Sequence, residues 1–186
     1  IMPLLKTPVC EFGRKAESFK LKSINNQLMS LNDIKGERAT LIMFICNHCP
    51  YVKAIIKDLA RDCGELKKEG IESVAIMSND TKNYPEDSFE NMIKFAKLNN
   101  FGELNYLIDE TQEIAKKYGA VCTPDFFGYN KDLQLQYRGR FKELKDLKPM
   151  DNKVSDLSLA MKLIAKTQKG PDDQISSMGC SIKWIN

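Results

Sequence analysis

The sequence predicts an α/β fold in which helices flank a central mixed β-sheet. An unbroken apolar run at residues 40–45 is typical of a buried strand, and the apolar residues after it recur at spacings of three and four, as in an amphipathic helix. Strand-like and helix-like segments then alternate along the chain. Turn signals at residues 25–26 and 130–132 indicate two antiparallel hairpins, so the sheet is expected to be mixed.

The individual segments follow from local patterns. Residues 2–17 are expected to be irregular because Pro3 and Pro8 interrupt any element. The next predicted segments are an N-terminal hairpin at 19–22 and 28–31, a helical turn at 32–36, a strand at 40–45, a helix at 50–69 and a strand at 71–77. They are followed by a helix from about 84, a strand at 104–108, a short helix from Asp109 to Gly119, a hairpin at 126–129 and 133–138, and a helix at about 154–166.

The chain is expected to form one domain with a tail. Residues 10–166 hold the predicted sheet and helices, including the N-terminal hairpin and a linker that contains Pro149. Residues 167–186 form a polar C-terminal tail that carries the single tryptophan, Trp184. Because a large aromatic side chain is costly to leave in water, we expect this tail to pack on the domain.

Composition and charge exclude several classes of partner. The chain has 186 residues, of which 42% are hydrophobic and 28% charged, with a net charge of +3. That charge is too small and too mixed to indicate nucleic acid or an anionic membrane as a partner. No apolar run approaches the roughly 18–20 residues that a membrane-spanning helix needs. Ile1 is interpreted as a cloning remnant before the natural start at Met2, and the absence of a signal-peptide pattern predicts a cytoplasmic location.

Two cysteines, Cys46 and Cys49, lie where the buried strand ends and the following helix begins. The first turn of a helix has unpaired N–H groups and the positive end of the helix dipole, and both favour a thiolate over a thiol. A spacing of two residues also lets the second sulfur reach the first. Cys46 is therefore predicted to attack a disulfide, and Cys49 to resolve the mixed disulfide that forms.

His48 is the only histidine and lies between the two cysteines. A partly charged imidazole beside the thiolate would stabilise the reduced form and make the disulfide more oxidising. The alternative interpretation is a solvent-exposed residue at the helix start that does not affect the sulfurs.

The order of elements, with a Cys-x-x-Cys after the first core strand, resembles the thioredoxin fold. The segment from Ala115 to Pro124 is similar to the part of that superfamily in which a helix end leads to a cis-proline. The resemblance implies that Pro124 is cis and faces Cys46, and that the Thr123 backbone pairs with a substrate chain as an added strand. The alternative is that Pro124 only ends a loop.

Further strings resemble the peroxiredoxin-like branch of the superfamily, which includes alkyl hydroperoxide reductase and thiol-specific antioxidant (the redoxins), and within it an uncharacterised bacterial subgroup. These strings are Cys46–Val52, Ser78–Asp80, Asp109–Gln112, Cys122–Phe127, Tyr137–Arg140 and Gly179–Trp184. The chain departs from true peroxiredoxins because neither cysteine is preceded by their Pro-x-x-x-Thr/Ser-x-x-Cys pattern. It also departs from thioredoxins because the strand at 40–45 has no carboxylate, so proton transfer must use His48, water or a group elsewhere.

The other cysteines are assigned by their context. Cys63 lies on the apolar face of the first long helix and is expected to pack in the core. Cys122 is placed near the site by its closeness to Pro124, where it is either a packed residue, which we favour, or an additional redox thiol. Cys180 lies in the tail and is a candidate for a further resolving thiol. Cys10 has no informative context.

The leading hypothesis is a thiol–disulfide oxidoreductase that needs no cofactor. Its expected partners are a disulfide-containing protein or small molecule and an unidentified thiol reductant. One alternative is a peroxiredoxin-like thiol peroxidase. Another is a non-catalytic zinc-binding or interaction module using Cys46 and Cys49 with Cys122 or Cys180, although no second Cys-x-x-Cys or His pair supports it and no metal is expected.

Overall fold

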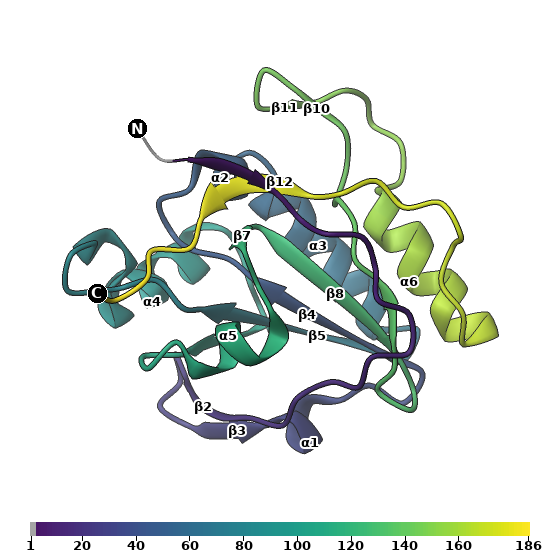
Figure 1. Ribbon diagram of the computed structural model, residues 1–186, viewed down its shortest axis with the longest axis horizontal. Coiled ribbons are helices and arrows are strands. Elements are labelled where there is room, and N and C mark those ends of the chain that lie inside the picture. Colours follow the sequence, from purple (N-terminus) through teal and green to yellow (C-terminus); the bar gives the residue numbers. More distant parts are fainter. Residues whose placement is uncertain (1–2) are drawn as a thin grey trace.

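In the computed structural model, which describes residues 3–186, strand β4 (Ala39–Phe44) runs through the middle of a seven-stranded mixed sheet (Figure 1). It pairs in parallel with β5 (Ile71–Met77) and antiparallel with β8 (Asp125–Asn130). The sheet order is β3-β2-β6-β5-β4-β8-β9, and the remaining bounds are Leu28–Ser30 for β3, Lys20–Ser23 for β2, Asn105–Ile108 for β6 and Leu135–Tyr137 for β9. The predicted mixed sheet is confirmed, with one predicted hairpin at each edge.

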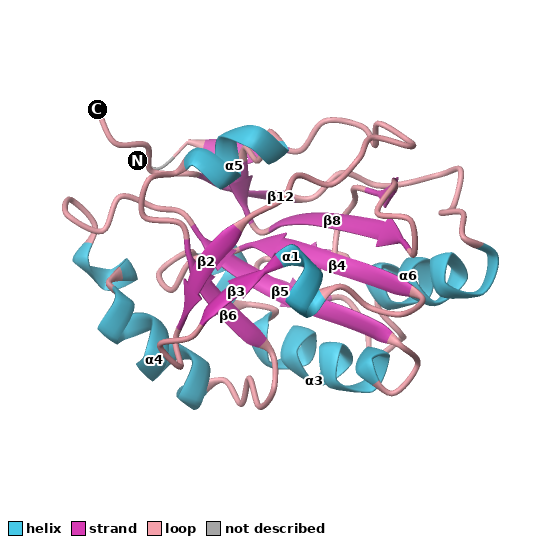
Figure 2. Cartoon of the chain, turned by 90° about the horizontal axis from the view of Figure 1, so that it is seen from below, coloured by secondary structure: helices cyan, strands magenta, loops and turns pink. Residues whose placement is uncertain are grey.

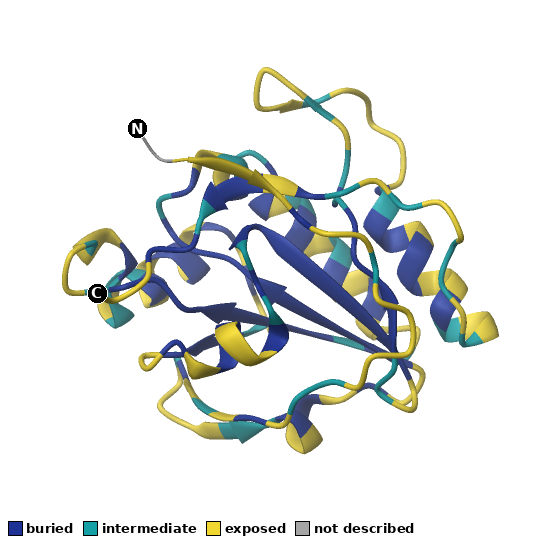
Figure 3. Cartoon of the chain, viewed as in Figure 1, coloured by how far each residue is buried: buried dark blue, intermediate teal, exposed yellow. Residues whose placement is uncertain are grey.

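Helices cover both faces of this sheet (Figure 2). One face carries α3 (Ile56–Lys67), α4 (Phe89–Leu98) and α6 (Asp156–Thr167), and the other carries the short helices α1 (Leu31–Ile34) and α5 (Glu113–Tyr118). Successive side chains of β4 enter the two cores in turn, and every residue of β4 and β8 is buried (Figure 3). Burial on both faces explains why β4 has an unbroken apolar run and no alternation.

A second, three-stranded sheet joins the two ends of the chain to the middle. Its order is β1-β12-β7, with β1 at Leu4–Lys6, β12 at Met178–Ser181 and β7 at Cys122–Thr123. The expectation of an irregular segment at 2–17 is therefore wrong for β1. A three-residue strand has no readable pattern, and its partner lies in the tail at the other end of the chain. The interpretation of Ile1 and Met2 lies outside the described residues.

Two predicted helices are each divided. The helix expected at 50–69 consists of α2 (Pro50–Lys53) and α3, and the backbone at Ile55 has a φ of −121°. Ile55 and Ile56 are consecutive β-branched residues, which lose side-chain freedom in a helix, and the break falls there. The helix expected from about 84 begins as a 3₁₀ turn, η1 (Pro85–Asp87), before α4 starts after its N-cap Ser88.

Smaller differences concern the linker and the helix ends. The linker around Pro149 forms a short ladder of β10 (Leu144–Lys145) and β11 (Lys148–Pro149). The carboxylate of Asp109 does cap α5, since it accepts hydrogen bonds from two backbone N–H groups of that helix. Among residues 3–186, no helix has both the length and the apolar character needed to cross a bilayer.

A buried ion pair anchors the loop that precedes β8. Arg138 Nη2 lies 2.9 Å from Asp125 Oδ2 and also donates to the Gly119 carbonyl at 2.9 Å. Asp125 Oδ2 accepts a further hydrogen bond, of 3.0 Å, from the Val121 N–H. Burial raises the pKa of the Asp125 carboxyl even though Arg138 acts to lower it. The pair therefore holds the segment 119–125 against the end of β9.

Replacement of this arginine should destabilise the fold strongly. Arg138→Met is expected to lower the free energy of unfolding by about 3–5 kcal/mol, because it leaves the buried Asp125 without its partner. Urea denaturation followed by circular dichroism measures this loss. The matched control is Lys67→Met, which removes an exposed pair with Glu103 and should change stability far less. Equal losses in both variants would contradict the assigned importance of the buried pair.

Candidate active site

The two cysteines of the Cys-x-x-Cys lie in the loop between β4 and α2, as the sequence predicts. Cys49 is the N-cap residue of α2, and Pro50 occupies the first helical position, where its missing N–H is tolerated. Both thiols are enclosed, with Cys46 1% exposed and Cys49 0% exposed. The pair is therefore positioned by the end of β4 on one side and by the start of a helix on the other.

Thr123 contacts both sulfurs from the opposite side. The peptide bond between Thr123 and Pro124 is cis, as the resemblance implied. Thr123 Oγ1 lies 3.4 Å from Cys46 Sγ, and Cys49 Sγ lies 3.1 Å from the Thr123 carbonyl oxygen, to which it donates in its protonated form. The structure thus brings together four of the predicted site residues, Cys46, Cys49, Thr123 and Pro124.

The surroundings of the pair favour negative charge on Cys49. The hydrogen bond from the Cys46 thiol lowers the pKa of Cys49 to about 5, with further help from the backbone N–H and side chain of Cys180. The same hydrogen bond, together with burial and the charge of Asp87, raises the pKa of Cys46. Sequence reasoning predicts Cys46 as the attacking thiolate from the helix start alone, and local patterns could not locate Asp87 or Cys180 beside the pair.

Asp87 is a fully buried carboxylate that the sequence analysis missed. It comes from η1 and is 0% exposed. Its Oδ1 accepts from the Asn47 N–H at 2.8 Å, and its Oδ2 accepts from Asn79 Nδ2 at 2.8 Å. The Asn47 side chain is held in turn by the Tyr106 hydroxyl at 2.8 Å. The strand at 40–45 has no carboxylate, and Asp87 places one beside the site from another segment. Sequence reasoning missed it because acidic residues that follow a proline are typical of a helix start.

His48 faces this carboxylate. Its Nδ1 lies 2.7 Å from Asp87 Oδ2, and its ring stacks on Tyr84 with centroids 5.9 Å apart and planes 6° apart. The His48 side chain is 15% exposed, so it does not match the alternative of a solvent-exposed residue. The Asp87 carboxylate raises the pKa of His48, which favours the imidazolium form.

Cys46, His48 and Asp87 also present three potential metal-ligand atoms within 4.8 Å of one another. Tetrahedral zinc with bonds of about 2.0–2.1 Å would hold N and O ligand atoms roughly 3.3 Å apart. The 2.7 Å between His48 Nδ1 and Asp87 Oδ2 is shorter than this and suits an ion pair. This observed set also differs from the cysteine set that the zinc hypothesis named.

Cys63, Cys122 and Cys180 lie in different surroundings. Cys63 lies on the buried face of α3 and packs in the core, as predicted, and burial raises its pKa to about 12. Cys122 is fully buried beside Pro124, with its Sγ 3.6 Å from the Pro124 carbonyl oxygen. Cys180 lies on β12, opposite Thr123 in the register, and contacts Cys49. Cys180 therefore adjoins the pair directly, whereas Cys122 points back into its own loop.

The tail around Cys180 is fastened to the loop that follows β5. The Lys183 N–H donates to Asn79 Oδ1 at 2.9 Å, and Gln112 Nε2 donates to the Lys183 carbonyl at 2.7 Å. The Asp80 N–H donates to the same carbonyl at 2.8 Å. Asn79 therefore bonds the tail through its oxygen and Asp87 through its nitrogen.

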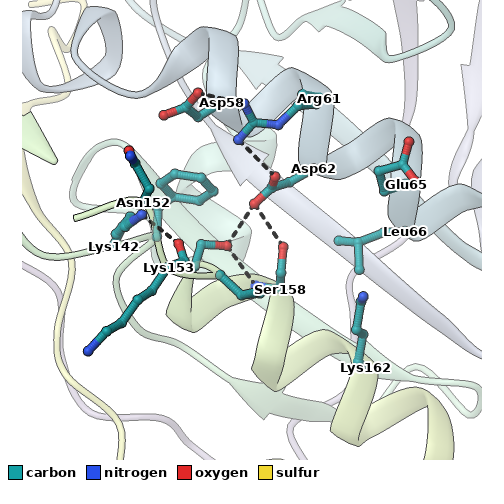
Figure 4. A pocket seen from close by; sticks show the side chains of 13 residues that line it. Asp58, Arg61, Asp62, Glu65, Leu66, Lys142, Asn152, Lys153, Ser158 and Lys162 are labelled. Carbon is teal, nitrogen blue, oxygen red and sulfur yellow. Dashed lines mark hydrogen bonds and ion pairs between the residues drawn. The ribbon is translucent and has the colours of Figure 1, made fainter.

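A separate pocket lies between α3 and α6 (Figure 4). At its centre Asp62 accepts hydrogen bonds from the hydroxyls of Ser155, at 2.8 Å, and Ser158, at 2.9 Å. The residues that line it include none of the predicted site residues. Its polar groups stabilise the start of α6.

The charge on Cys49 can be measured directly. Thiolates absorb in the ultraviolet, so a pH titration of the reduced protein should show an absorbance step with a midpoint near the pKa of about 5. Because this pKa is lowered on folding, the associated stability is present above the unfolded value and lost as pH falls through 5. The step should vanish in Cys49→Ser and persist in Cys63→Ser. A step that survives in Cys49→Ser would contradict the assignment.

The Asp87–His48 pair makes a second prediction about pH. Asp87→Asn should lower the pKa of His48, which NMR can follow without ambiguity because the chain has one histidine. In the native protein the raised pKa adds stability below pH 6.5 that is lost as pH rises through the folded value. Asp87→Asn should remove this pH dependence. Glu86→Gln is the matched control, and an equal shift in both variants would argue against a specific pair.

Comparison with known proteins places this geometry in a family. Residues 12–141 match the model of the AhpC/TSA family. An uncharacterised conserved protein from Geobacillus kaustophilus is 40% identical, with a TM-score of 0.88 over 99% of this chain and 97% of that chain. A hypothetical protein from Sinorhizobium meliloti is 35% identical, with a TM-score of 0.88 over 97% of each chain. No match was found among curated proteins.

More distant structures identify the fold. The thioredoxin domain of a thiol-disulfide oxidoreductase from Bacteroides vulgatus is 16% identical, with a TM-score of 0.58 over 68% of this chain and 86% of that chain. At this identity the likeness concerns the fold alone, and the predicted thioredoxin fold is confirmed. With its family model matched over most of its length, the chain belongs to the AhpC/TSA family of thioredoxin-fold redox proteins.

Proposed function

We propose that the protein is a thiol–disulfide oxidoreductase that acts on protein or small-molecule disulfides through Cys46 and Cys49. The observation that carries the proposal is a buried pair of cysteines at a helix start, with Thr123 beside both sulfurs. The surroundings also lower the pKa of Cys49 to about 5. A thiolate at neutral pH is the reactive species in disulfide exchange. The family membership supports redox chemistry in general, and the paired cysteines support this particular reaction.

The ionisations of the two thiols are linked, with the pKa of Cys46 raised and that of Cys49 lowered, so one proton can serve both sulfurs. Its movement from Cys46 to Cys49 places the thiolate on Cys46, which attacks a substrate sulfur and releases the other substrate sulfur as a thiolate. Cys49 then loses the proton, to the released thiolate or to solvent, and attacks Cys46. The second substrate sulfur leaves, and the Cys46–Cys49 disulfide forms. Two electrons pass from the pair to the substrate, and a cytosolic thiol reductant would restore the dithiol.

His48 and Thr123 are proposed to assist without exchanging electrons. A protonated His48 attracts the Cys49 thiolate and so favours the reduced form, which makes the disulfide more oxidising. Thr123 would position the substrate through the backbone beside its cis peptide bond, as an added strand. In the structure that edge is paired with β12, so a protein substrate could use it only after β12 has moved.

Redox titration is the test of the main reaction. In glutathione buffers of defined potential, alkylation and mass mapping should reveal a reversible Cys46–Cys49 disulfide with a midpoint between roughly −270 and −120 mV. Cys46→Ser and Cys49→Ser should each reduce the rate of insulin disulfide reduction about 100-fold or more, since each removes one half of a two-step exchange. Cys63→Ser is the control. Failure of the Cys46–Cys49 disulfide to form at any potential would refute the proposal.

Thiol peroxidase activity is a second candidate. It is favoured by the family membership and by the Thr123 hydroxyl, 3.4 Å from Cys46 Sγ, which could orient a bound peroxide. Stopped-flow mixing of the reduced protein with hydrogen peroxide distinguishes the two. Slow thiol loss supports the exchange reaction, and fast second-order loss would make the peroxidase the primary function.

A further inference from the structure

The C-terminal strand occupies the position at which a substrate chain would pair. In the sheet β1-β12-β7, β12 lies antiparallel to β7, with Cys180 opposite Thr123 and Ser181 opposite Cys122. Figure 1 shows this yellow strand beside β1 and next to α2. A cysteine of the chain itself is therefore held where a docked peptide would present its own cysteine to the pair.

Close packing fixes this register. Gly179 lies so near the loop before Pro124 that a Cβ atom there would overlap the carbonyl oxygen of Thr123. The Ser177 hydroxyl adds a hydrogen bond of 2.8 Å to the Pro124 carbonyl. Beyond the strand, the bond from Lys183 to Asn79 continues the attachment. Contacts on both sides of Cys180 therefore hold its position along β7.

Cys180 and Cys49 are direct neighbours. The backbone N–H and the side chain of Cys180 both act to lower the pKa of Cys49, and the two cysteines belong to the same buried cluster. Cys180 is 7% exposed, against 0% for Cys49. In the reduced protein, burial and the Cys49 thiolate raise the pKa of Cys180 to about 12. Oxidation of Cys49 would remove that negative charge, and the nearby Lys183 acts to lower the pKa of Cys180.

We propose that Cys180 is a third redox thiol, which replaces Cys46 as the disulfide partner of Cys49 by thiol–disulfide exchange. This inference rests on the proposed function, because it starts from the Cys46–Cys49 disulfide. The Cys180 thiolate attacks Cys49 Sγ, the Cys46–Cys49 bond breaks and the Cys49–Cys180 bond forms. Cys46 leaves as a thiolate and takes up the proton that Cys180 lost. The exchange conserves the number of disulfides and needs no external oxidant.

The exchange would control access to the site. A Cys49–Cys180 disulfide ties β12 covalently to the start of α2 and keeps the Thr123 edge closed to a substrate chain. In the Cys46–Cys49 form only hydrogen bonds and packing hold β12, so the strand can leave. The position of one disulfide thus determines whether the substrate edge is available.

The test uses a variant that cannot form the Cys46–Cys49 disulfide, so that a Cys49–Cys180 disulfide can accumulate. Full-length Cys46→Ser is equilibrated with oxidised and reduced glutathione, quenched with acid, alkylated and mapped by mass spectrometry. Most molecules should carry a Cys49–Cys180 disulfide. Cys46→Ser/Cys180→Ser should lose it, and the matched control Cys46→Ser/Cys122→Ser should keep it. Circular dichroism checks that each variant is folded.

Two outcomes would overturn the inference. One is a folded Cys46→Ser protein that carries glutathione on Cys49 and no Cys49–Cys180 disulfide. The other, which needs no variant that might misfold, is a wild-type titration with the Cys46–Cys49 disulfide alone and a midpoint unchanged by Cys180→Ser. In both cases a wild-type Cys46–Cys49 disulfide leaves the proposed function standing. If the wild-type protein forms neither disulfide, both proposals fall.

Discussion

The buried Asp87 carboxylate is the constraint around which the site is arranged. A charge removed from water must be matched by polar partners, and two segments supply them: the Asn47 N–H and the Asn79 amide donate hydrogen bonds, and the His48 ring forms an ion pair. These donors fix the loop that carries Cys46 and Cys49 relative to the end of β5. The charge of Asp87 also disfavours ionisation of Cys46, so the same group that orders the loop helps decide which sulfur carries the negative charge.

A second constraint comes from the opposite side of the sulfurs. The loop before β8 is held by the buried Arg138–Asp125 pair, and Thr123 at its end contacts both Cys46 and Cys49. The sulfurs therefore lie between two clusters of buried polar contacts, one around Asp87 and one around Asp125. The C-terminal strand closes the remaining side by pairing with β7. Such enclosure suits a dithiol whose reactions are controlled by movement of a covering strand.

The sequence predicted those features that leave a local pattern. The apolar run of β4, the Cys-x-x-Cys after it and the hairpin of β8 and β9 are all encoded within a few neighbouring residues. The cis bond before Pro124 followed from a resemblance that joins two distant motifs. β1, β12 and Asp87 were missed because each is defined by a partner far away in the chain. The effects of Asp87 on the pKa of Cys46 and of Cys180 on the pKa of Cys49 could not be predicted for the same reason.

Asn79 has two bonds whose consequences extend beyond its own loop. Its amide nitrogen donates to Asp87, and its amide oxygen accepts from the N–H of Lys183 in the tail. Departure of the tail would leave that oxygen without its partner and free the amide to rotate away from Asp87. Asn79 thus links the attached tail to the surroundings of the Asp87–His48 pair. Any change that tail attachment makes to the free energy of proton binding at His48 equals the change that proton binding makes to the free energy of tail attachment, because two linked equilibria affect each other equally.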